Sequence, residues 1–171
     1  MNRCLQIAGC AVGVLLASAC SSGGVSADQK SATPGGSTAA PATSTAPNMA
    51  GPAGVMATQN SLGTMLTDLH GRAVYSFEAD KTSTSTCTDK CAQDWPPLTT
   101  TGTPAAGAGV NAAMLATSPR PDGTTQLTYN GHPLYYYDDD HGPGTTAGQG
   151  ENAFGAKWYV LNPAGLKIDN D

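Results

Sequence analysis

The chain has 171 residues, a formal net charge of −5 at pH 7 and an aromatic content of 6%. Thirteen acidic residues outnumber eight basic ones, which argues against nucleic-acid binding and against electrostatic docking on an anionic membrane. Glycine and proline occur 21 and 12 times, and no long stretch shows helical periodicity. This composition favours short strands joined by turns.

The first 19 residues are typical of an export signal. The basic residue Arg3 precedes an apolar stretch at residues 7–19, and residues 16–20 have the sequence Leu-Ala-Ser-Ala-Cys. This pattern resembles a bacterial lipobox, in which the cysteine is acylated and becomes the mature N-terminus, so Cys20 is the predicted lipidation site for palmitate or a similar chain. Cys10 also fits the local pattern, but almost no apolar segment precedes it. The apolar stretch is too short to span a hydrocarbon layer of roughly 30 Å.

Residues 20–54 form a predicted tether. Serine, threonine, alanine, glycine and proline dominate this segment, and its only charges are Asp28 and Lys30. Such a segment buries too little apolar surface to offset the entropy lost on ordering, so we expect it to be disordered. It would hold a folded domain away from the membrane, and a glycosylated, mucin-like stalk is the compositional alternative.

The folded domain is predicted at residues 55–171, and it contains an internal repeat. Repeat one covers about 55–103 and repeat two about 104–171. Residues 66–80 reappear as residues 127–140, with three pairs aligned at one common offset: Gly71 and Gly131, Tyr75 and Tyr135, and Asp80 and Asp140. A repeat of this length indicates two similar structural units that share a core.

Both repeats contain a predicted β-hairpin. In repeat two, Asn130-Gly131 is typical of a two-residue type I′ turn, and such a turn pairs Tyr129 with His132. In repeat one, a three-residue loop at residues 69–71 ends in a left-handed glycine and closes the same hairpin with one extra residue.

Strand parity sorts the hairpin side chains onto two faces. Val74 and Leu134 fall on one face. The opposite face carries Tyr75, Phe77, Tyr135 and Tyr137. Because both faces are apolar, each hairpin is expected to pack on two sides.

Each repeat continues beyond its hairpin to a tryptophan, Trp95 in the first and Trp158 in the second. Short helical turns are predicted at residues 88–93 and 111–116, and an irregular loop at residues 138–150. The predicted fold is therefore all-β, with two tandem antiparallel units in a sandwich-like, pseudo-two-fold arrangement.

Cys87 and Cys91 remain once Cys20 carries lipid and the earlier cysteines leave with the signal. An exported protein meets oxidising conditions, so a disulfide is the favoured interpretation, worth roughly 2 kcal/mol for so short a loop. The alternatives are a redox-active pair and a metal site. A zinc site would need two further ligands, and the three histidines are scattered singly.

A set of motifs shared by the two repeats resembles a known family. Each repeat contains a tyrosine followed, after four residues, by an aspartate. The accompanying motifs are Leu66-Thr67-Asp68, Gly71-Arg72, Cys87, Cys91, Trp95-Pro96-Pro97-Leu98, Asp122-Gly123, residues 126–131, Gly148-Gln149-Gly150 and Trp158-Tyr159. Over essentially all of residues 62–165 the chain resembles the bacterial secreted-repeat lipoproteins. The resemblance implies an exported lipoprotein with tandem copies, and because the biochemical role of the family is uncharacterised, no active-site residues can be carried over from it.

The aromatic and acidic residues of the repeats are candidates for ligand binding. They are Tyr75, Asp80, Tyr135, Tyr137, Asp140 and Trp158. Aromatic rings bind glycans and extended peptides because flat rings give contact area at low entropy cost. In the alternative interpretation the tyrosines fill the core and the aspartates accept backbone N–H groups where strands end. The presence of the motif in both copies favours this alternative.

Asp138, Asp139, Asp140 and His141 are the densest group of potential metal ligands. Hard cations such as calcium take several oxygen ligands from flexible loops of this kind. The alternating spacing of a calcium loop is absent and no glutamate follows at the usual distance. A solvated acidic loop is therefore favoured, and no cofactor is expected.

The function expected from these features is that of a non-catalytic binding module of the cell envelope. Its lipid would hold it to the membrane, and its partner would be cell-wall glycan or an envelope protein. No serine lies in a nucleophile elbow and no carboxylate pair has a supporting frame, so we do not expect an enzyme. The alternative is a metal-binding or redox accessory protein that uses residues 138–141 or the cysteine pair.

Overall fold

The computed structural model describes residues 52–170 of the chain. The predicted signal, the predicted lipidation site Cys20 and nearly all of the predicted tether lie outside the described residues. No helix among residues 52–170 has the length and apolar character needed to cross a membrane.

The described residues form nine short strands, one α-helix and one 3-10 turn. In chain order they are β1 (Gly54–Asn60), β2 (Gly63–Asp68), β3 (Tyr75–Phe77), α1 (Asp89–Asp94), β4 (Ala105–Ala106), the 3-10 turn (Ala112–Met114), β5 (Leu115–Pro119), β6 (Thr125–Tyr129), β7 (His132–Pro133), β8 (Asn152–Ala153) and β9 (Ala156–Val160). The all-β prediction is confirmed, and both predicted helical turns are present within one or two residues.

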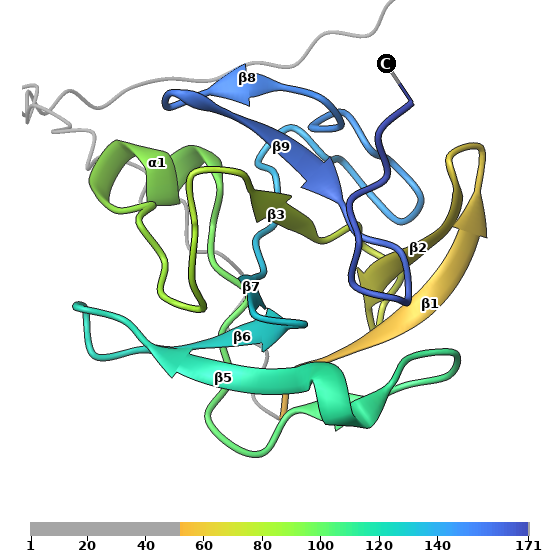
Figure 1. The fold of residues 1–171 in the computed structure, drawn as a ribbon, viewed down its shortest axis with the longest axis horizontal. Coiled ribbons are helices and arrows are strands. Elements are labelled where there is room, and N and C mark those ends of the chain that lie inside the picture. Colours follow the sequence, from red (N-terminus) through yellow and green to blue (C-terminus); the bar gives the residue numbers. More distant parts are fainter. Residues whose placement is uncertain (1–51, 171) are drawn as a thin grey trace, which may run out of the picture. The chain divides into compact units, whose positions relative to one another are not determined.

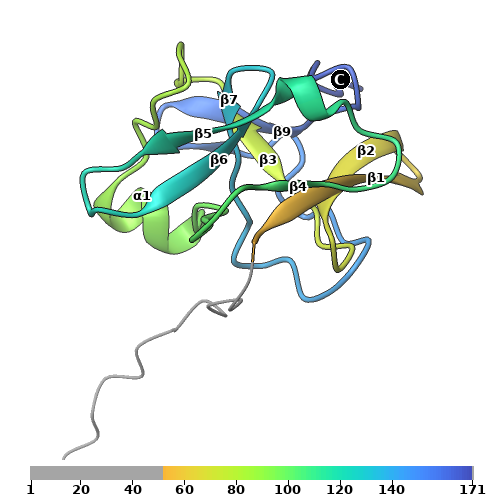
Figure 2. The same cartoon turned by 90° about the horizontal axis from the view of Figure 1, so that it is seen from below.

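The strands are arranged in three small sheets, with the orders β2-β1-β4, β3-β9-β8 and β5-β6-β7. Figure 1 shows β5, β6 and β7 on one side of the domain and β3, β8 and β9 on the other, and Figure 2 shows β5 and β6 side by side from below. All named strand pairs are antiparallel except the short contact between β1 and β4, which is parallel. The helix α1 lies beside the β3-β9-β8 sheet (Figure 1).

Both predicted hairpin turns are confirmed. Asn130 and Gly131 adopt φ angles of 49° and 81°, as a type I′ turn requires, and Tyr129 pairs with His132. In the first repeat the Asp68 N–H donates to the carbonyl oxygen of Arg72 at 2.8 Å, which closes the three-residue loop. The left-handed residue that this loop needs is Gly71, with φ of 83°.

The two faces predicted from strand parity become two separate cores. Val74 and Leu134 belong to an aliphatic cluster of buried residues around Leu66 and Leu127. The other core is mainly aromatic, and its buried members include Tyr75, Phe77, Trp95, Tyr135 and Trp158. Each hairpin therefore packs on both sides, because successive strand residues point to opposite faces of a sheet.

Tyr75 and Tyr135, which occupy equivalent positions in the two repeats, pair with each other. The Tyr75 N–H donates to the Tyr135 carbonyl at 2.8 Å, and the Tyr135 N–H donates to the Tyr75 carbonyl at 3.0 Å. Any hydrogen-bonded pair in an antiparallel ladder has a local two-fold axis, and here that axis relates equivalent residues of the two repeats. The axis of the predicted pseudo-two-fold arrangement passes between these two tyrosines.

The repeats exchange their last strands. In the first exchange, β9 of repeat two pairs with β3 of repeat one, so that Phe77 lies opposite Trp158. In the second, Leu98 of repeat one accepts a hydrogen bond of 2.8 Å from the Leu127 N–H and donates one of 2.9 Å to the Leu134 carbonyl in repeat two. Each antiparallel unit therefore contains strands from both sequence repeats.

The exchanged segments carry the two tryptophans into one stack of rings. Trp95 and Trp158 are stacked with ring centroids 3.9 Å apart and an interplanar angle of 5°. Phe77 covers the outer side of Trp158 at 4.1 Å, and Tyr137 stacks on Trp95 at 4.2 Å. This stack forms the centre of the aromatic core.

Candidate functional site

The tyrosine and aspartate residues of the repeated motif bond across the repeats. The Tyr75 hydroxyl donates to Asp140 Oδ2 at 2.7 Å, and the Tyr135 hydroxyl donates to Asp80 Oδ2 at 2.6 Å. All four residues are buried. Each repeat thus supplies the donor for one buried bond and the acceptor for the other.

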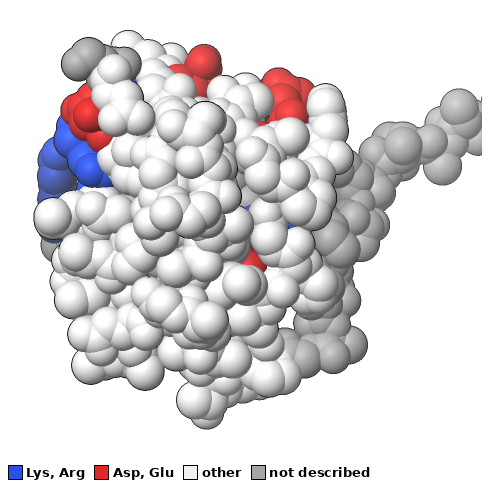
Figure 3. All heavy atoms as spheres, turned by 90° about the vertical axis from the view of Figure 1, so that its right-hand side faces the viewer, with Lys and Arg blue, Asp and Glu red and all other residues white. Residues whose placement is uncertain are grey.

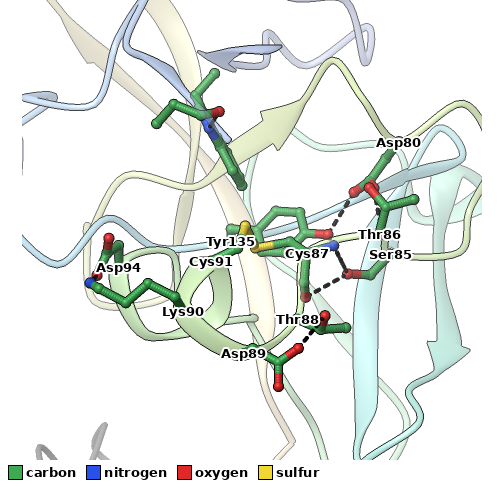
Figure 4. Close-up of a disulfide and its surroundings, with 12 residues drawn as sticks. Asp80, Ser85, Thr86, Cys87, Thr88, Asp89, Lys90, Cys91, Asp94 and Tyr135 are labelled. Carbon is green, nitrogen blue, oxygen red and sulfur yellow. Dashed lines mark hydrogen bonds and ion pairs between the residues drawn. A yellow bond between two sulfur atoms is a disulfide. The ribbon is translucent and has the colours of Figure 1, made fainter. Parts of the chain in front are cut away.

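Each motif aspartate also holds the loop that follows it. Asp80 Oδ1 accepts hydrogen bonds from the backbone N–H and the hydroxyl of Thr86, at 2.7 and 2.6 Å (Figure 4). Asp140 Oδ1 accepts the Ala147 N–H at 2.8 Å. A buried carboxylate that receives several hydrogen bonds fixes local structure, so this geometry supports the structural interpretation of the motif.

The two motif tyrosines are held as neutral donors. Burial, and then the hydrogen bond to Asp140, raises the pKa of Tyr75 far above its usual range. Burial and the bond to Asp80 raise the pKa of Tyr135 in the same way. A proton on these phenols is what allows them to stabilise the buried carboxylates.

A buried arginine, which the sequence analysis missed, lies next to the second of these pairs. Arg120 Nη1 donates to Ser85 Oγ and to Gln126 Oε1, both at 2.7 Å, and Nη2 donates to the Cys87 carbonyl at 2.8 Å. Ser85 Oγ also lies 2.7 Å from the Tyr135 hydroxyl. No local pattern identifies Arg120, because its partners Ser85 and Cys87 lie 35 and 33 residues away in the sequence.

The predicted disulfide between Cys87 and Cys91 is confirmed. Both cysteines are buried, and Cys91 lies within α1 (Figure 4). The bridge fixes the start of α1 to the loop that carries the Asp80 and Arg120 contacts.

The acidic loop after β7 does not assemble a metal site among residues 52–170. No group of three or more His, Cys, Asp or Glu side chains in this part of the chain is placed to hold an ion. Asp140 is bonded to Tyr75, and Asp139 accepts a hydrogen bond from the Tyr137 hydroxyl at 3.2 Å. His141 is exposed.

The structure does contain a surface cleft, with a volume of about 320 Å³. It lies between the end of α1, the start of the acidic loop and the β8–β9 hairpin. Its lining residues are Asp94, Trp95, Tyr137, Asp138, Asp139, Glu151, Ala153 and Phe154. The cleft thus combines four carboxylates with three aromatic rings.

The four carboxylates of the cleft differ in whether they have a hydrogen-bond or ion-pair partner. Asp94 forms an ion pair with Lys90, one turn earlier on α1 (Figure 4). Asp139 accepts the Tyr137 hydroxyl, and burial together with this bond raises the pKa of Tyr137. Within residues 52–170 the side chains of Asp138 and Glu151 have no hydrogen-bond or ion-pair partner. These two carboxylates give the cleft negative charge that the described protein does not neutralise.

Trp95 contributes an unpaired donor to the cleft. Its side chain is 1% exposed, and its indole N–H donates to no group in the described part of the chain. Every side-chain nitrogen or oxygen that is sealed from solvent there has a partner, so this N–H retains contact with solvent. The six-membered edge of the ring is covered by Gly148, where an added Cβ would lie 2.6 Å from Cη2. The N–H edge is on the other side of the ring, and the cleft is the solvent space that Trp95 lines.

Trp158 is the tryptophan of repeat two that corresponds to Trp95, and its indole N–H has a hydrogen-bond partner within the protein. The Trp158 indole N–H donates to the Ala153 carbonyl at 3.2 Å. The pseudo-two-fold relationship therefore breaks at the two indole donors, and only Trp95 is left to bond outside the protein.

Phe154 forms the rim of the cleft at the tip of the β8–β9 hairpin. It is 45% exposed and adopts a φ of 57°, followed by Gly155 at 90°. This is the turn geometry that Asn130-Gly131 uses in repeat two, and it is costly for a bulky side chain.

Three residues singled out from the sequence lie at the cleft: Tyr137, Asp138 and Asp139. The other predicted ligand-binding residues, Tyr75, Asp80, Tyr135, Asp140 and Trp158, lie in the interior. Sequence reasoning missed Asp94, Trp95, Glu151 and Phe154 as a group. The one local signal is Phe154-Gly155, where phenylalanine takes the place that a turn gives to asparagine.

Comparison with known proteins matches two segments of the chain, residues 56–99 and 116–162, to the family described as a secreted repeat of unknown function. The two segments together cover more than half of the chain. The chain belongs to this secreted-repeat family. No curated protein and no solved structure matches it.

Family membership places the secreted-repeat domain outside the cytoplasm. Each matched segment ends just after Leu98 or Leu161, the residues through which the repeats exchange their last strands. Each matched sequence repeat therefore ends with the segment that pairs with the strands of the other repeat.

Proposed function

We propose that this secreted-repeat protein is a non-catalytic binding module, tied to the cell membrane by lipid on Cys20. The lipobox-like sequence at residues 16–20 supports the anchor, and the Ser-, Thr- and Pro-rich segment after it supports a tether. The domain would then bind an envelope component within reach of the membrane.

The observation that carries the binding role is the cleft between α1 and the β8–β9 hairpin. It brings together unpaired carboxylates, an unpaired indole N–H and an exposed phenylalanine, in a domain whose other buried polar side chains are satisfied. Concave sites with aromatic walls and a few convergent polar groups are typical of ligand binding. The lining contains no serine, cysteine or histidine that could act as a nucleophile. No specific observation favours the metal or redox alternative.

The anchor is tested by growing cells that express the full-length chain with an alkyne-tagged palmitate. We expect label on the wild-type protein and on Cys10→Ser, and none on Cys20→Ser. The Cys20→Ser variant should also leave the membrane fraction. Equal labelling of Cys20→Ser and the wild type would overturn the anchor.

The binding role is tested by placing a photo-crosslinking amino acid at Phe154 in the full-length protein on intact cells. Leu166, which is 61% exposed in a turn outside the cleft lining, is the matched control position. We expect a defined adduct from position 154 and not from position 166. The same pattern of adducts from both positions, or no adduct from position 154, would contradict a binding site at the cleft.

A further inference from the structure

We propose that the cleft binds an extended peptide that carries a basic side chain. This inference rests on the proposed binding role of the cleft, and it names the ligand class from the groups that line the cleft. The peptide's cation would meet Asp138 and Glu151, and one of its backbone carbonyls would accept the indole N–H of Trp95.

The exposed carboxylates of the cleft give it a negative charge that favours a cationic ligand. Asp138 and Glu151 are unpaired within residues 52–170, whereas Glu78 elsewhere on the surface pairs with Lys167 at 2.8 Å. The part of the surface seen in Figure 3 carries only scattered charged groups among uncharged residues, whereas the cleft gathers four carboxylates in its lining. A Lys- or Arg-type group placed between carboxylates forms charge-assisted hydrogen bonds, which are stronger than bonds between neutral groups.

The unpaired N–H of Trp95 requires an acceptor in the same ligand. A metal ion or a polyamine supplies positive charge but no hydrogen-bond acceptor, so neither would satisfy both features of the cleft. A peptide supplies both, because each residue offers a carbonyl acceptor next to its side chain. Leaving a nearly buried donor unpaired in a complex carries a desolvation penalty, which favours ligands that can accept this bond.

The ring geometry favours a peptide over a neutral glycan. Sugars bind by stacking on an open aromatic face, but the two faces of Trp95 are covered by Tyr137 and Trp158, at 4.2 and 3.9 Å. Trp95 is only 1% exposed, so it offers no face for stacking, and its indole N–H is the group that lacks a partner. Phe154 is exposed at the rim, where it can cover the aliphatic stem of a long basic side chain.

The size of the cleft agrees with one anchored side chain. Its volume of about 320 Å³ is near the lower limit for ligand pockets. It accommodates a lysine-type side chain and its own backbone, and the rest of a peptide would run over the rim.

The test uses the full-length chain in detergent micelles with ¹⁵N-labelled tryptophan. The chain has two tryptophans, so its spectrum contains two indole N–H signals. The probe is an N-acetylated, C-amidated peptide with the sequence Gly-Gly-Lys-Gly-Gly. The matched probes carry norleucine, which removes the charge, or glutamate, which reverses it. Spermidine supplies a cation without a carbonyl.

We expect the lysine peptide to shift the Trp95 indole signal in a saturable manner and to leave the Trp158 signal in place. Asp138→Asn and Glu151→Gln should each weaken binding about tenfold, as expected for the loss of one charged hydrogen bond. Glu78→Gln, which removes a carboxylate outside the cleft lining, should leave the affinity unchanged.

Equal affinity for the norleucine and lysine peptides would overturn the role of the basic side chain. Spermidine binding as tightly as the lysine peptide would overturn the role of the carbonyl. If crosslinking from Phe154 succeeds but the lysine peptide does not bind, the peptide inference fails and the binding role stands. If both experiments fail, the binding role fails with it.

Discussion

Tyr75 of the first repeat donates a 2.7 Å hydrogen bond to Asp140 of the second repeat, across the point where Tyr75 and Tyr135 pair through their backbones. The reciprocal bond joins Tyr135 to Asp80 at 2.6 Å. The tyrosine–aspartate motif looks like a local unit in the sequence, but its side chains form hydrogen bonds that hold the two repeats together. Each aspartate also closes the loop that follows it, through Thr86 or Ala147.

Removing either hydroxyl should destabilise the domain. We expect Tyr75→Phe and Tyr135→Phe each to lower the free energy of unfolding by about 2 kcal/mol, because each leaves a buried carboxylate short of one hydrogen bond. Urea denaturation followed by tryptophan fluorescence measures the change. Tyr137→Phe is the control, because its hydroxyl bonds to Asp139 in an exposed contact, and its effect should be within about 0.5 kcal/mol. A similar decrease in the free energy of unfolding in all three variants would contradict the role of these hydrogen bonds in holding the repeats together.

The same tyrosines make the domain sensitive to alkaline pH. Burial and the bonded aspartates raise the folded-state pKa of Tyr75 and Tyr135 above the value of about 10 expected in the unfolded chain. The folded state therefore keeps protons that the unfolded state releases. Stability from these groups is complete below about pH 10 and is lost as the pH rises beyond it, by about 1.4 kcal/mol per pH unit for each tyrosine.

Urea midpoints measured at about pH 8 and at several values above pH 10 test this dependence. The slope should be smaller in Tyr75→Phe, since that variant has one fewer phenol to ionise. Wild-type stability that stays constant above pH 10 would contradict the burial of these phenols.

Strand exchange predicts that neither repeat folds alone. A fragment covering residues 52–103 lacks β9, which pairs with β3, and a fragment covering residues 104–170 lacks the segment around Leu98. We expect each fragment to give the circular dichroism of an unfolded chain, and an equimolar mixture to recover the near-ultraviolet signal of the stacked tryptophans. Native-like signal from either fragment by itself would show that the exchange is dispensable.

The disulfide should contribute modestly. Because it closes a very short loop, Cys87→Ser combined with Cys91→Ser should lower the free energy of unfolding by about 2 kcal/mol and leave a folded domain. Denaturation of the wild type with and without reductant gives an independent value. A thiol assay on the unfolded, unreduced wild type should detect no free thiol from this pair, and two free thiols would contradict the bridge.

We expect Phe154 to favour ligand binding and to lower the stability of the folded domain. Asparagine adopts positive φ more readily than phenylalanine, so Phe154→Asn should raise the free energy of unfolding by about 1 kcal/mol. The same change should weaken binding of the lysine peptide, because it removes the ring from the rim of the cleft. Asn130→Phe, the reverse change in the corresponding turn geometry, should destabilise the domain. Loss of stability in Phe154→Asn would show that the ring is held by packing.

The sequence alone determined the local structure of the domain. Asn130-Gly131 specifies its turn because only residues that tolerate positive φ fit there, and strand parity assigned Val74 and Tyr75 to different cores. The disulfide followed from elimination, since Cys87 and Cys91 are the cysteines left once the predicted signal and the predicted lipidation site Cys20 are set aside. These features depend on backbone sterics, side-chain alternation and composition, which are all visible within short segments.

Only the tertiary structure decided which groups meet. Two equivalent motifs give no local indication of whether Tyr75 bonds to Asp80 or to Asp140, and the exchange of strands makes the choice. The cleft is equally non-local, because α1, the acidic loop and the β8–β9 hairpin come from separate segments of the sequence and meet around the stacked tryptophans. Packing leaves the Trp95 N–H without a partner, whereas the Trp158 N–H donates to Ala153, and this difference between equivalent residues is visible only in the folded domain.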